Sequence, residues 1–361
     1  MLRREKKDVS QVGSSKHDSV VWIRLSSVQR ALYEAFLKTA EVATALQTDS
    51  KSNPLVLLTS LSQICVHPWL NLTEGGFREA MNKPHSVPCE GLGTISSSSK
   101  IGVTMALLQQ ALKDDRKTLV FSRSKRLLHM VAYLLDEASI SFCRFDGDLS
   151  ATDRHQAVTT FNDSPSVKVC LLTTQVGGVG LTFTSASCVI LMDPSWNPSA
   201  DSQAIDRVHR IGQTRDVQVF RLISTGTVEE KVYRNQIFKL MAARQIAGED
   251  GSHLFRYFTK LQLRSMFEVG DLEDSETARQ LEELHPDRVT DTVRAYTSSI
   301  PQVAAVSDNG CVLTERITGG EEMEEYSQPF SEKRSRTTSV SPGRPPRFGK
   351  ILRAWMTCGK C

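Results

Sequence analysis

The stretch "VKVCLLTTQVGGVGLTFTSASCVILMD", residues 167–193, places two apolar runs on either side of a glycine-rich segment. The runs 167–173 and 188–193 are short, rich in β-branched residues and bounded by Thr, Ser and Pro, which is typical of buried strands. Glycines at 177, 178 and 180 tolerate positive φ and let backbone N–H groups approach a ligand. The residues alone leave two interpretations: a tight turn, or a loop that approaches a phosphate or sugar.

Strands and helices alternate outward from this stretch. Apolar periodicity predicts a first strand from Val20, further strands at 118–122, 141–146 and 217–223, and helices at 101–112, 124–138, 151–162 and 228–246. A further helix is expected to hold residues 203–215. This alternation predicts right-handed crossovers and a parallel sheet covered on both faces, an α/β fold. Ligands of such sheets bind at the carboxyl ends of the strands.

Composition narrows the class of protein. The chain has 361 residues, 40% hydrophobic and 24% charged, with a net charge of +3 that permits basic patches without predicting a nucleic-acid partner. No apolar run approaches the ~18 residues of a membrane span, so no membrane partner is expected. Cys65, Cys143, Cys170 and Cys188 lie in apolar surroundings that predict buried thiols. The terminal "CGKC", 358–361, lacks a second ligand pair, so no metal site is expected.

The segment "QAIDRVHRIGQTR", residues 203–215, carries Arg207 and Arg210 three positions apart. On a helix, residues at this spacing share one face, and two guanidiniums on one face favour an anion between them. The alternative is a solvated face on which Asp206 and Glu229 or Glu230 pair with the arginines. The segment follows "CVILMDPSWNP", so we expect the arginines at the carboxyl edge of the sheet, close to the glycine loop.

Together these motifs resemble the second RecA-like lobe of superfamily two helicases and translocases, and their wording is similar to that of the Swi/Snf-related ATPases. The resemblance covers residues 2 to about 275, through "LRREKKDV", "LSSVQRALYEAFL", "LSQICVHPWL", "SSK", "TLVFSRS", "RFDGDLSATDRHQAVTTFN", "DRVHRIGQ" and "GTVEEK". "FRYFTKLQLRSMFEVGDL" is most similar to the excision-repair cross-complementing-six-like group, which is related to Cockayne syndrome B.

The resemblance implies a domain plan. Residues 1–18 correspond to the end of an interlobe linker, 19–97 to a helical protrusion with a surface insertion at 71–98, and 98–250 to the RecA-like lobe. Residues 251–300 correspond to a brace. Residues 301–361, which contain "EEMEE" and then a basic Ser/Pro/Arg segment, are expected to be a disordered tail that can bind protein partners.

The resemblance also implies site residues. Arg207 and Arg210 match the arginine fingers that reach the β and γ phosphates of ATP, with Gln203 and Asp206 in the same catalytic motif. Gly178 and Gly180 match the loop near the nucleotide. In this family, a set of residues contacts the phosphates of one strand of double-stranded DNA. The residues of this chain that match the set are Ser122, Arg123, Asp146, Gly147, Thr173 and Thr174. Mg²⁺ is expected to be held mainly by the first lobe. The family also implies roles in DNA repair or chromosome maintenance in the nucleus.

The sequence differs from the family's motifs at several positions, and these differences bear on the expected activity. No GxxxxGK[ST] occurs in the sequence, so the first lobe is expected to lie outside it, and the chain alone is expected not to hydrolyse ATP. "DEAS", 136–139, ends a helical segment and is rejected as the acidic Mg²⁺ box. Ser62 and Gln63 replace residues that are usually basic. Two alternatives stay open: a stand-alone DNA or protein interaction module, and an RNA helicase lobe, against which Gln213 counts.

Overall fold

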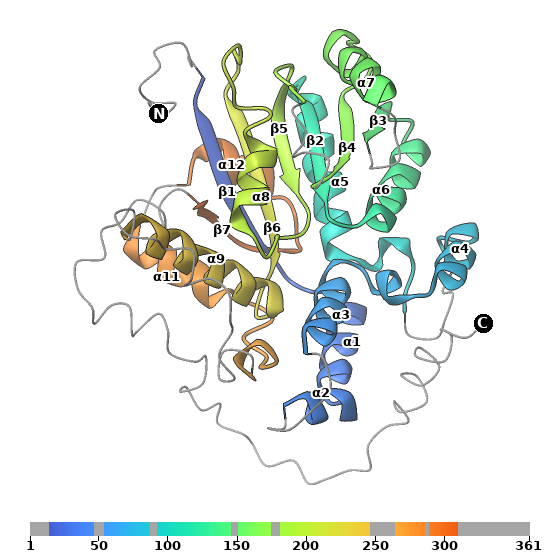
Figure 1. Ribbon diagram of the computed structural model, residues 1–361, viewed down its shortest axis with the longest axis vertical. Helices are drawn as coiled ribbons and strands as arrows, with labels where there is room; N and C mark the ends of the chain where they lie inside the picture. Colours follow the sequence, from blue (N-terminus) through green and yellow to red (C-terminus); the bar gives the residue numbers. More distant parts are fainter. Residues whose placement is uncertain are drawn as a thin grey trace.

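A seven-stranded sheet lies at the centre of the protein, for which we analysed a computed structural model (Figure 1). The structure describes residues 14–46, 54–86, 92–145, 151–174, 181–245, 264–285 and 289–309, with backbone alone for 151–155 and 238–245. The strand order is β3-β4-β2-β5-β6-β1-β7. The strands are β1 (Lys16–Ile23), β2 (Lys117–Ser122), β3 (Phe142–Phe145), β4 (Val169–Thr173), β5 (Ala186–Leu191), β6 (Val217–Ser224) and β7 (Val303–Asp308).

Six strands are parallel, as the alternation predicted, and β7 runs antiparallel to β1. β2, β4, β5 and β6 are almost entirely buried because helices cover both faces of the sheet. The helices are α1 (Ser27–Leu37), α2 (Ala40–Ala45), α3 (Pro54–Val66), α4 (Glu74–Asn82), α5 (Ser99–Lys113), α6 (Lys125–Glu137), α7 (Ala151–Asp163), α8 (Pro198–Ile205), α9 (Val228–Gln245), α11 (Glu276–Leu284) and α12 (Asp291–Thr297).

Alternate residues of each strand feed two separate cores, because successive side chains of a strand point to opposite faces. On β2, Val120 packs with α5, α6 and α12 on one face, whereas Leu119 packs with α7 and α8 on the other. Trp22 of β1 packs with Tyr233 of α9 and Ala278 of α11 on the face shared with α8. None of the described helices is long and apolar enough to span a bilayer.

The protrusion helices form a third core against the start of α9. Tyr33, Leu58, Val228 and Phe267 are buried together, and the Tyr33 hydroxyl accepts a hydrogen bond of 2.9 Å from the backbone N–H of Val228. The buried Gln29 side chain donates to two carbonyls at the end of α3 and accepts from the backbone of α5. α1 and α3 are therefore tied to the first helix of the main lobe.

Three parts of the predicted plan need correction. The strand from Val20 is confirmed as β1, but it lies inside the main sheet and not in the protrusion. The expected tail begins too early, because 303–308 form β7, whose Ser307 accepts a 2.9 Å bond from the Trp22 indole. The predicted surface insertion contains α4, whose Phe77 is buried, and the short helices η2 (Pro68–Asn71) and η3 (Ile95–Ser97).

Four predicted free thiols are confirmed within the described residues. Cys65, Cys170 and Cys188 are buried and Cys143 is half-buried, and none of the four forms a disulfide. Burial raises the pKa of the Cys188 thiol to about 12. Burial also raises the pKa of the Cys65 and Cys170 thiols, so these three buried thiols are protonated near neutral pH and serve as small apolar side chains of α3 and of the sheet.

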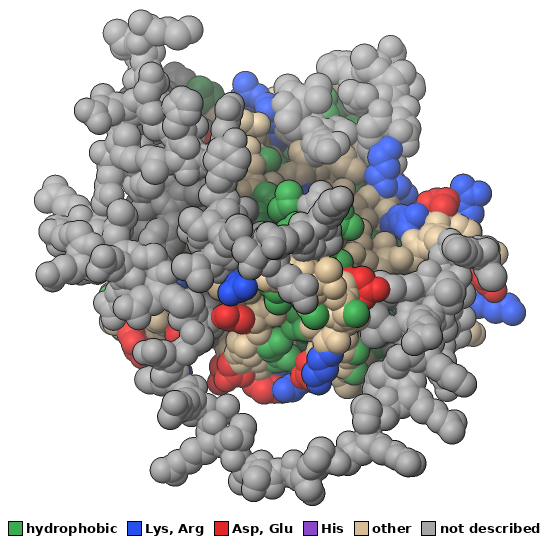
Figure 2. All heavy atoms as spheres, turned by 60° about the horizontal axis from the view of Figure 1, so that its bottom comes forward, with side chains coloured by type: hydrophobic (Ala, Val, Ile, Leu, Met, Phe, Trp, Pro, Cys, Tyr) green, Lys and Arg blue, Asp and Glu red, His purple; other side chains and the backbone are tan. Residues whose placement is uncertain are grey.

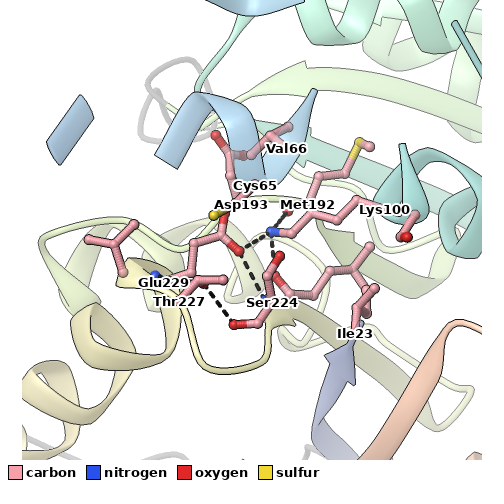
Figure 3. Close-up of polar contacts among 12 residues, drawn as sticks. Ile23, Cys65, Val66, Lys100, Met192, Asp193, Ser224, Thr227 and Glu229 are labelled. Atoms are coloured by element: carbon pink, nitrogen blue, oxygen red, sulfur yellow. Dashed lines mark hydrogen bonds and ion pairs between the residues drawn. The ribbon is translucent and has the colours of Figure 1, made fainter. Parts of the chain in front are cut away.

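A buried ion pair joins the carboxyl ends of β5 and β6 (Figure 3). The Nζ atom of Lys100 lies 2.7 Å from Oε2 of Glu229 and donates to the backbone oxygens of Met192, at 2.7 Å, and Leu222, at 2.8 Å. All three ammonium donors are thus used in a side chain with no exposed surface. The same Glu229 oxygen also accepts from the backbone N–H of Ser224.

Lys100→Met is expected to lower the free energy of unfolding by about 3–5 kcal/mol, because it leaves the buried Glu229 carboxylate without its counter-charge. Chemical denaturation measures the loss. Lys113→Met, at an exposed position of the same helix, is the matched control and should change stability by less than about 0.5 kcal/mol. Adding Glu229→Gln to Lys100→Met should recover part of the loss, and equal stability of Lys100→Met and the native chain would contradict the assignment.

Candidate functional site

The segment that carries Arg207 and Arg210 is a series of turns, not the predicted helix. α8 ends at Ile205, and Asp206 is its C-cap. The backbone oxygen of Arg207 accepts from the N–H of Phe183 at 3.1 Å and is not used by a following helical turn. The expectation that the two arginines share a helix face is therefore wrong, because α8 ends before Arg207 and the Arg207 carbonyl is bonded to a distant part of the chain.

Gln213 holds this arginine turn, residues 206–213, to the sheet. Its buried amide donates to the oxygens of Ala186, at 2.7 Å, and Val208, at 3.3 Å. Gly212 has a φ of 99°, which favours glycine, and lets the chain reverse just before Gln213. The Val208 side chain is fully buried in the core below. Sequence reasoning weighed Gln213 only as a departure from RNA helicases and missed this role.

The turn lies at the amino edge of the sheet, so the predicted carboxyl-edge location is wrong. Ala186 begins β5, and His209 contacts the backbone oxygen of Ser14 just before β1. α8 starts beyond the carboxyl end of β5 and carries the chain back across the face of the sheet, as a right-handed crossover requires. Its following residues therefore reach the opposite edge.

The predicted closeness of the arginines to the glycine-rich segment holds for the part of that segment the structure describes. Arg210 donates to the Thr182 hydroxyl at 3.1 Å, and Asn162 donates to the Thr182 backbone oxygen at 3.2 Å. Gly178 and Gly180 lie outside the described residues. Their stretch connects Thr174, at the carboxyl end of β4, with Leu181, next to the arginine turn.

Exposure distinguishes the polar residues around the turn. Gln203 and Asp206 are exposed at the end of α8, Arg207 is half-buried, and Arg210 is exposed. The alternative pairing with Glu229 or Glu230 is wrong, because both carboxylates are buried at the other edge. Glu229 contacts Lys100, and Glu230 accepts from the backbone N–H groups of Gly226 and Thr277 and from the Ser275 hydroxyl.

The predicted DNA-facing residues that the structure describes meet at the carboxyl ends of β2 and β4. Thr174 donates its backbone N–H to the oxygen of Ser122 at 3.0 Å. Ser122 is fully buried, its hydroxyl accepts from the N–H of Ser124, and Thr173 and Thr174 are also buried. Arg123 is the one exposed side chain of these four. Asp146 and Gly147 lie outside the described residues.

Arg123 is held by Asp193, which sequence reasoning did not single out. Both carboxylate oxygens of Asp193 lie 3.1 Å from the backbone N of Arg123, and Oδ2 lies 3.3 Å from its Nε. The signal was present in the sequence, since Asp193 directly follows the strand run "CVILM" and so had to lie at the carboxyl edge. No group of three or more metal-ligating side chains forms within the described ranges.

A buried charge cluster lies beneath α8. Arg221 of β6 donates to both carboxylate oxygens of Asp18 on β1, at 2.8 and 3.1 Å, and its Nη1 lies 3.9 Å from Asp201 of α8. Burial raises the pKa of Asp201 to about 6, against the opposing charge of Arg221 and the hydrogen bond from the Ser195 N–H. The start of α8 is thereby linked to the two strands beside it.

Comparison with known proteins gives two family matches. The helicase conserved C-terminal domain matches residues 100–212, and the SNF2-related domain matches residues 1–70. The Bos taurus protein named DNA excision repair protein ERCC-6-like is 37% identical over 334 residues, which is 86% of this chain and 27% of that protein. Protein CHROMATIN REMODELING 24 of Arabidopsis thaliana is 38% identical over 299 residues, 76% of this chain and 27% of the relative.

Solved structures give the same family. The Sulfolobus solfataricus SWI2/SNF2 ATPase core in complex with dsDNA has a TM-score of 0.55 and 29% identity, and the match covers 71% of this chain and 51% of that one. The C-terminal domain of a Sulfolobus solfataricus SWI2/SNF2 ATPase has a TM-score of 0.52 and 25% identity, covering 72% and 99%. The chain spans about a quarter of the length of the curated relatives it matches.

Asp201→Asn is expected to stabilise the protein above pH 6 and to have little effect near pH 4. The pKa of Asp201 is higher in the folded state than its ordinary 3.8, so the stability that depends on this carboxyl falls as pH rises from about 4 to about 6. At about 1.36 kcal/mol per pH unit, the loss reaches about 3 kcal/mol above pH 6. Urea denaturation from pH 4 to 8 measures it, and parallel pH profiles of the two proteins would exclude this role.

Proposed function

The chain belongs to the SNF2-related family, whose conserved C-terminal helicase domain it carries, and from this premise we propose that it is the second RecA-like lobe of an ATP-dependent translocase on double-stranded DNA. The observation that carries the proposal is the arginine turn. It is fixed by backbone bonds and by Gln213, yet it leaves the Arg210 side chain exposed beside Thr182. A rigid turn with an outward guanidinium suits the binding of phosphate.

On the nucleotide side, Arg207 and Arg210 are proposed to reach the β and γ phosphates of ATP across a cleft formed with a first lobe. Gln203 and Asp206, exposed at the end of α8, would help to position them, with Gly178 and Gly180 near the nucleotide. Bound ATP–Mg²⁺ supplies the phosphoryl group and neutralises charge that develops on it. The chain's own arginines stabilise the rest of that charge. Alone, the chain is expected not to hydrolyse ATP.

On the DNA side, Arg123 is the side chain best placed to contact a phosphate. Lys125, the first residue of α6, is exposed next to it, and Arg144 of β3 donates to the Lys125 backbone oxygen at 3.4 Å. On the side of the molecule where α4 and α6 lie, Figure 2 shows several basic side chains with acidic ones among them. We propose contact through the DNA backbone, so binding should depend on salt and little on sequence. Ser122, Thr173 and Thr174 support this edge from below, and Asp146 and Gly147 are proposed to extend it.

The two proposed surfaces lie at opposite edges of one sheet, and this separation suggests how they communicate. Thr174 lies at the carboxyl edge, at the end of β4, and Thr182, eight residues later in the chain, lies beside Arg210 at the amino edge. α8 makes the same crossing on the way to Arg207. A movement of the arginine turn when the two lobes close around ATP would therefore be transmitted along the chain to the DNA-facing edge. A translocase needs this coupling between ATP hydrolysis and DNA binding.

The names of the relatives suggest the setting. Proteins named for DNA excision repair and chromatin remodelling share 37 and 38% identity with the chain, so we propose work in DNA repair or chromosome maintenance in the nucleus. The proposed activity is translocation along intact duplex DNA and does not include strand separation, although the matched domain is named for helicases. Protein partners are proposed for 301–361, of which only the first nine residues are described.

Arg207→Ala and Arg210→Ala, each made in a protein that joins this chain to a first lobe, are expected to lower the kcat of DNA-stimulated ATP hydrolysis by about 10³-fold or more. The physical reason is the loss of positive charge at the transferring phosphoryl group. A coupled ATPase assay at saturating DNA measures the rate. Arg279→Ala is the matched control, because Arg279 is exposed on α11, a helix that packs with β1 and α9 and belongs to neither proposed surface.

The control should hydrolyse ATP at the native rate. Normal hydrolysis by the double variant of Arg207 and Arg210 would refute the arginine-finger assignment. Measurable ATPase activity of the 361-residue chain alone would refute the proposal that it depends on a first lobe.

A further inference from the structure

Arg123 ends in two amino groups for which the described part of the chain shows no hydrogen bond. Its backbone N–H and its Nε are both directed at Asp193, while the side chain keeps 35% of its surface exposed. A guanidinium anchored through Nε keeps the fork formed by Nη1 and Nη2 free for a second acceptor. That fork matches the two oxygens of a phosphodiester.

Asp193 is itself buried, with a side chain that is 4% exposed, and it follows a residue, Met192, whose backbone is hydrogen-bonded on both sides. Met192 donates its N–H to the oxygen of Phe121 at 3.0 Å, and its carbonyl accepts from Lys100 at 2.7 Å (Figure 3). The Lys100–Glu229 pair thus fixes the backbone that carries Asp193, and Asp193 fixes Arg123. An anchored side chain loses less conformational entropy on binding than a freely rotating one.

We propose that Asp193 is a positioning residue for DNA: it orients the Arg123 guanidinium so that Nη1 and Nη2 grip a backbone phosphate. This inference rests on the proposed function, and it assigns a role to a carboxylate that lies against the DNA edge. Simple charge arithmetic predicts the opposite effect, because removing a negative charge beside a polyanion should strengthen binding. The positioning role therefore predicts that removing the Asp193 charge weakens DNA binding, whereas charge alone predicts that it strengthens binding.

The test measures binding of the 361-residue chain to a fluorescein-labelled DNA duplex by fluorescence anisotropy at several salt concentrations. Arg123→Ala should weaken binding by about tenfold, as loss of a charge-assisted hydrogen bond does, and should reduce the slope of log K against log salt by about 0.9. Asp193→Asn should also weaken binding, severalfold, despite the loss of a negative charge. Arg123→Lys should resemble Asp193→Asn, because lysine keeps the charge but has no Nε to anchor.

A double-mutant cycle tests whether Asp193 acts through Arg123. In the Arg123→Ala background, Asp193→Asn should cause no further weakening. Asp201→Asn is the matched control: it removes another buried carboxylate from the segment between β5 and β6, and the contacts of Asp201 are with Ser195, Arg221 and Gln236, not with Arg123. It should bind DNA as the native chain does. Thermal melts of every variant identify any that fail to fold, and the Arg123→Lys result then carries the test alone.

A readout without DNA separates this inference from the proposed function. In a ¹⁵N–¹H correlation spectrum, the Nε–H signal of Arg123 should be visible and slow to exchange, and it should be lost in Asp193→Asn. If the native chain binds DNA and Asp193→Asn binds equally or more tightly, the positioning role is wrong while the proposed function stands. If the signal behaves as expected but the native chain does not bind DNA, the proposed function fails, and the role assigned here to Arg123 fails with it.

Discussion

The buried contact between Lys100 and Glu229 is the interaction on which most of the lobe depends. It brings together the start of α5, the ends of β5 and β6 and the first turn of α9, four elements separated by up to 129 positions along the chain. Burial, together with the nearby Glu229 carboxylate, raises the pKa of the Cys65 thiol of α3 well above its ordinary value. A charge with no exposed surface is stable only when every donor is used, and this geometry achieves that.

The carboxyl edge owes its order to this contact. Met192 is fixed between Lys100 and β2, so Asp193 arrives at a defined position and takes up Arg123. Ser122, Thr173 and Thr174 are buried beneath it and shape the edge without facing outward: the Ser122 hydroxyl accepts from the N–H of Ser124, and the Ser122 carbonyl accepts from the N–H of Thr174. The carboxyl edge therefore presents the oriented guanidinium of Arg123 on a well-packed base. This arrangement suits contact with the phosphates of DNA rather than recognition of a base sequence.

The amino edge is organised independently, by Gln213. Its amide bonds, the positive φ of Gly212 and the burial of Val208 fold the arginine turn against the start of β5. At the carboxyl edge, just after β6, Gly226 packs closely against the backbone of Asp271. A Cβ at Gly226 would lie 2.2 Å from the Asp271 backbone oxygen, so only glycine allows this contact. Local hydrogen bonds and close backbone contacts thus determine the positions of the surface segments, whereas apolar packing determines how the helices lie against the sheet.

The sequence by itself determined the alternation of strands and helices, the two-faced burial of the central strands and the membership in the family, because these follow from local periodicity and from motifs in a fixed order. It could not determine that α8 ends at Ile205, or that the carbonyl of Arg207 just beyond it accepts a hydrogen bond from the distant Phe183. Nor could it place the arginine turn at the amino edge, bury Ser122, pair β7 with β1 or direct Asp193 at Arg123. Each of these outcomes depends on hydrogen bonds between residues far apart in the chain, which only the folded arrangement brings within reach.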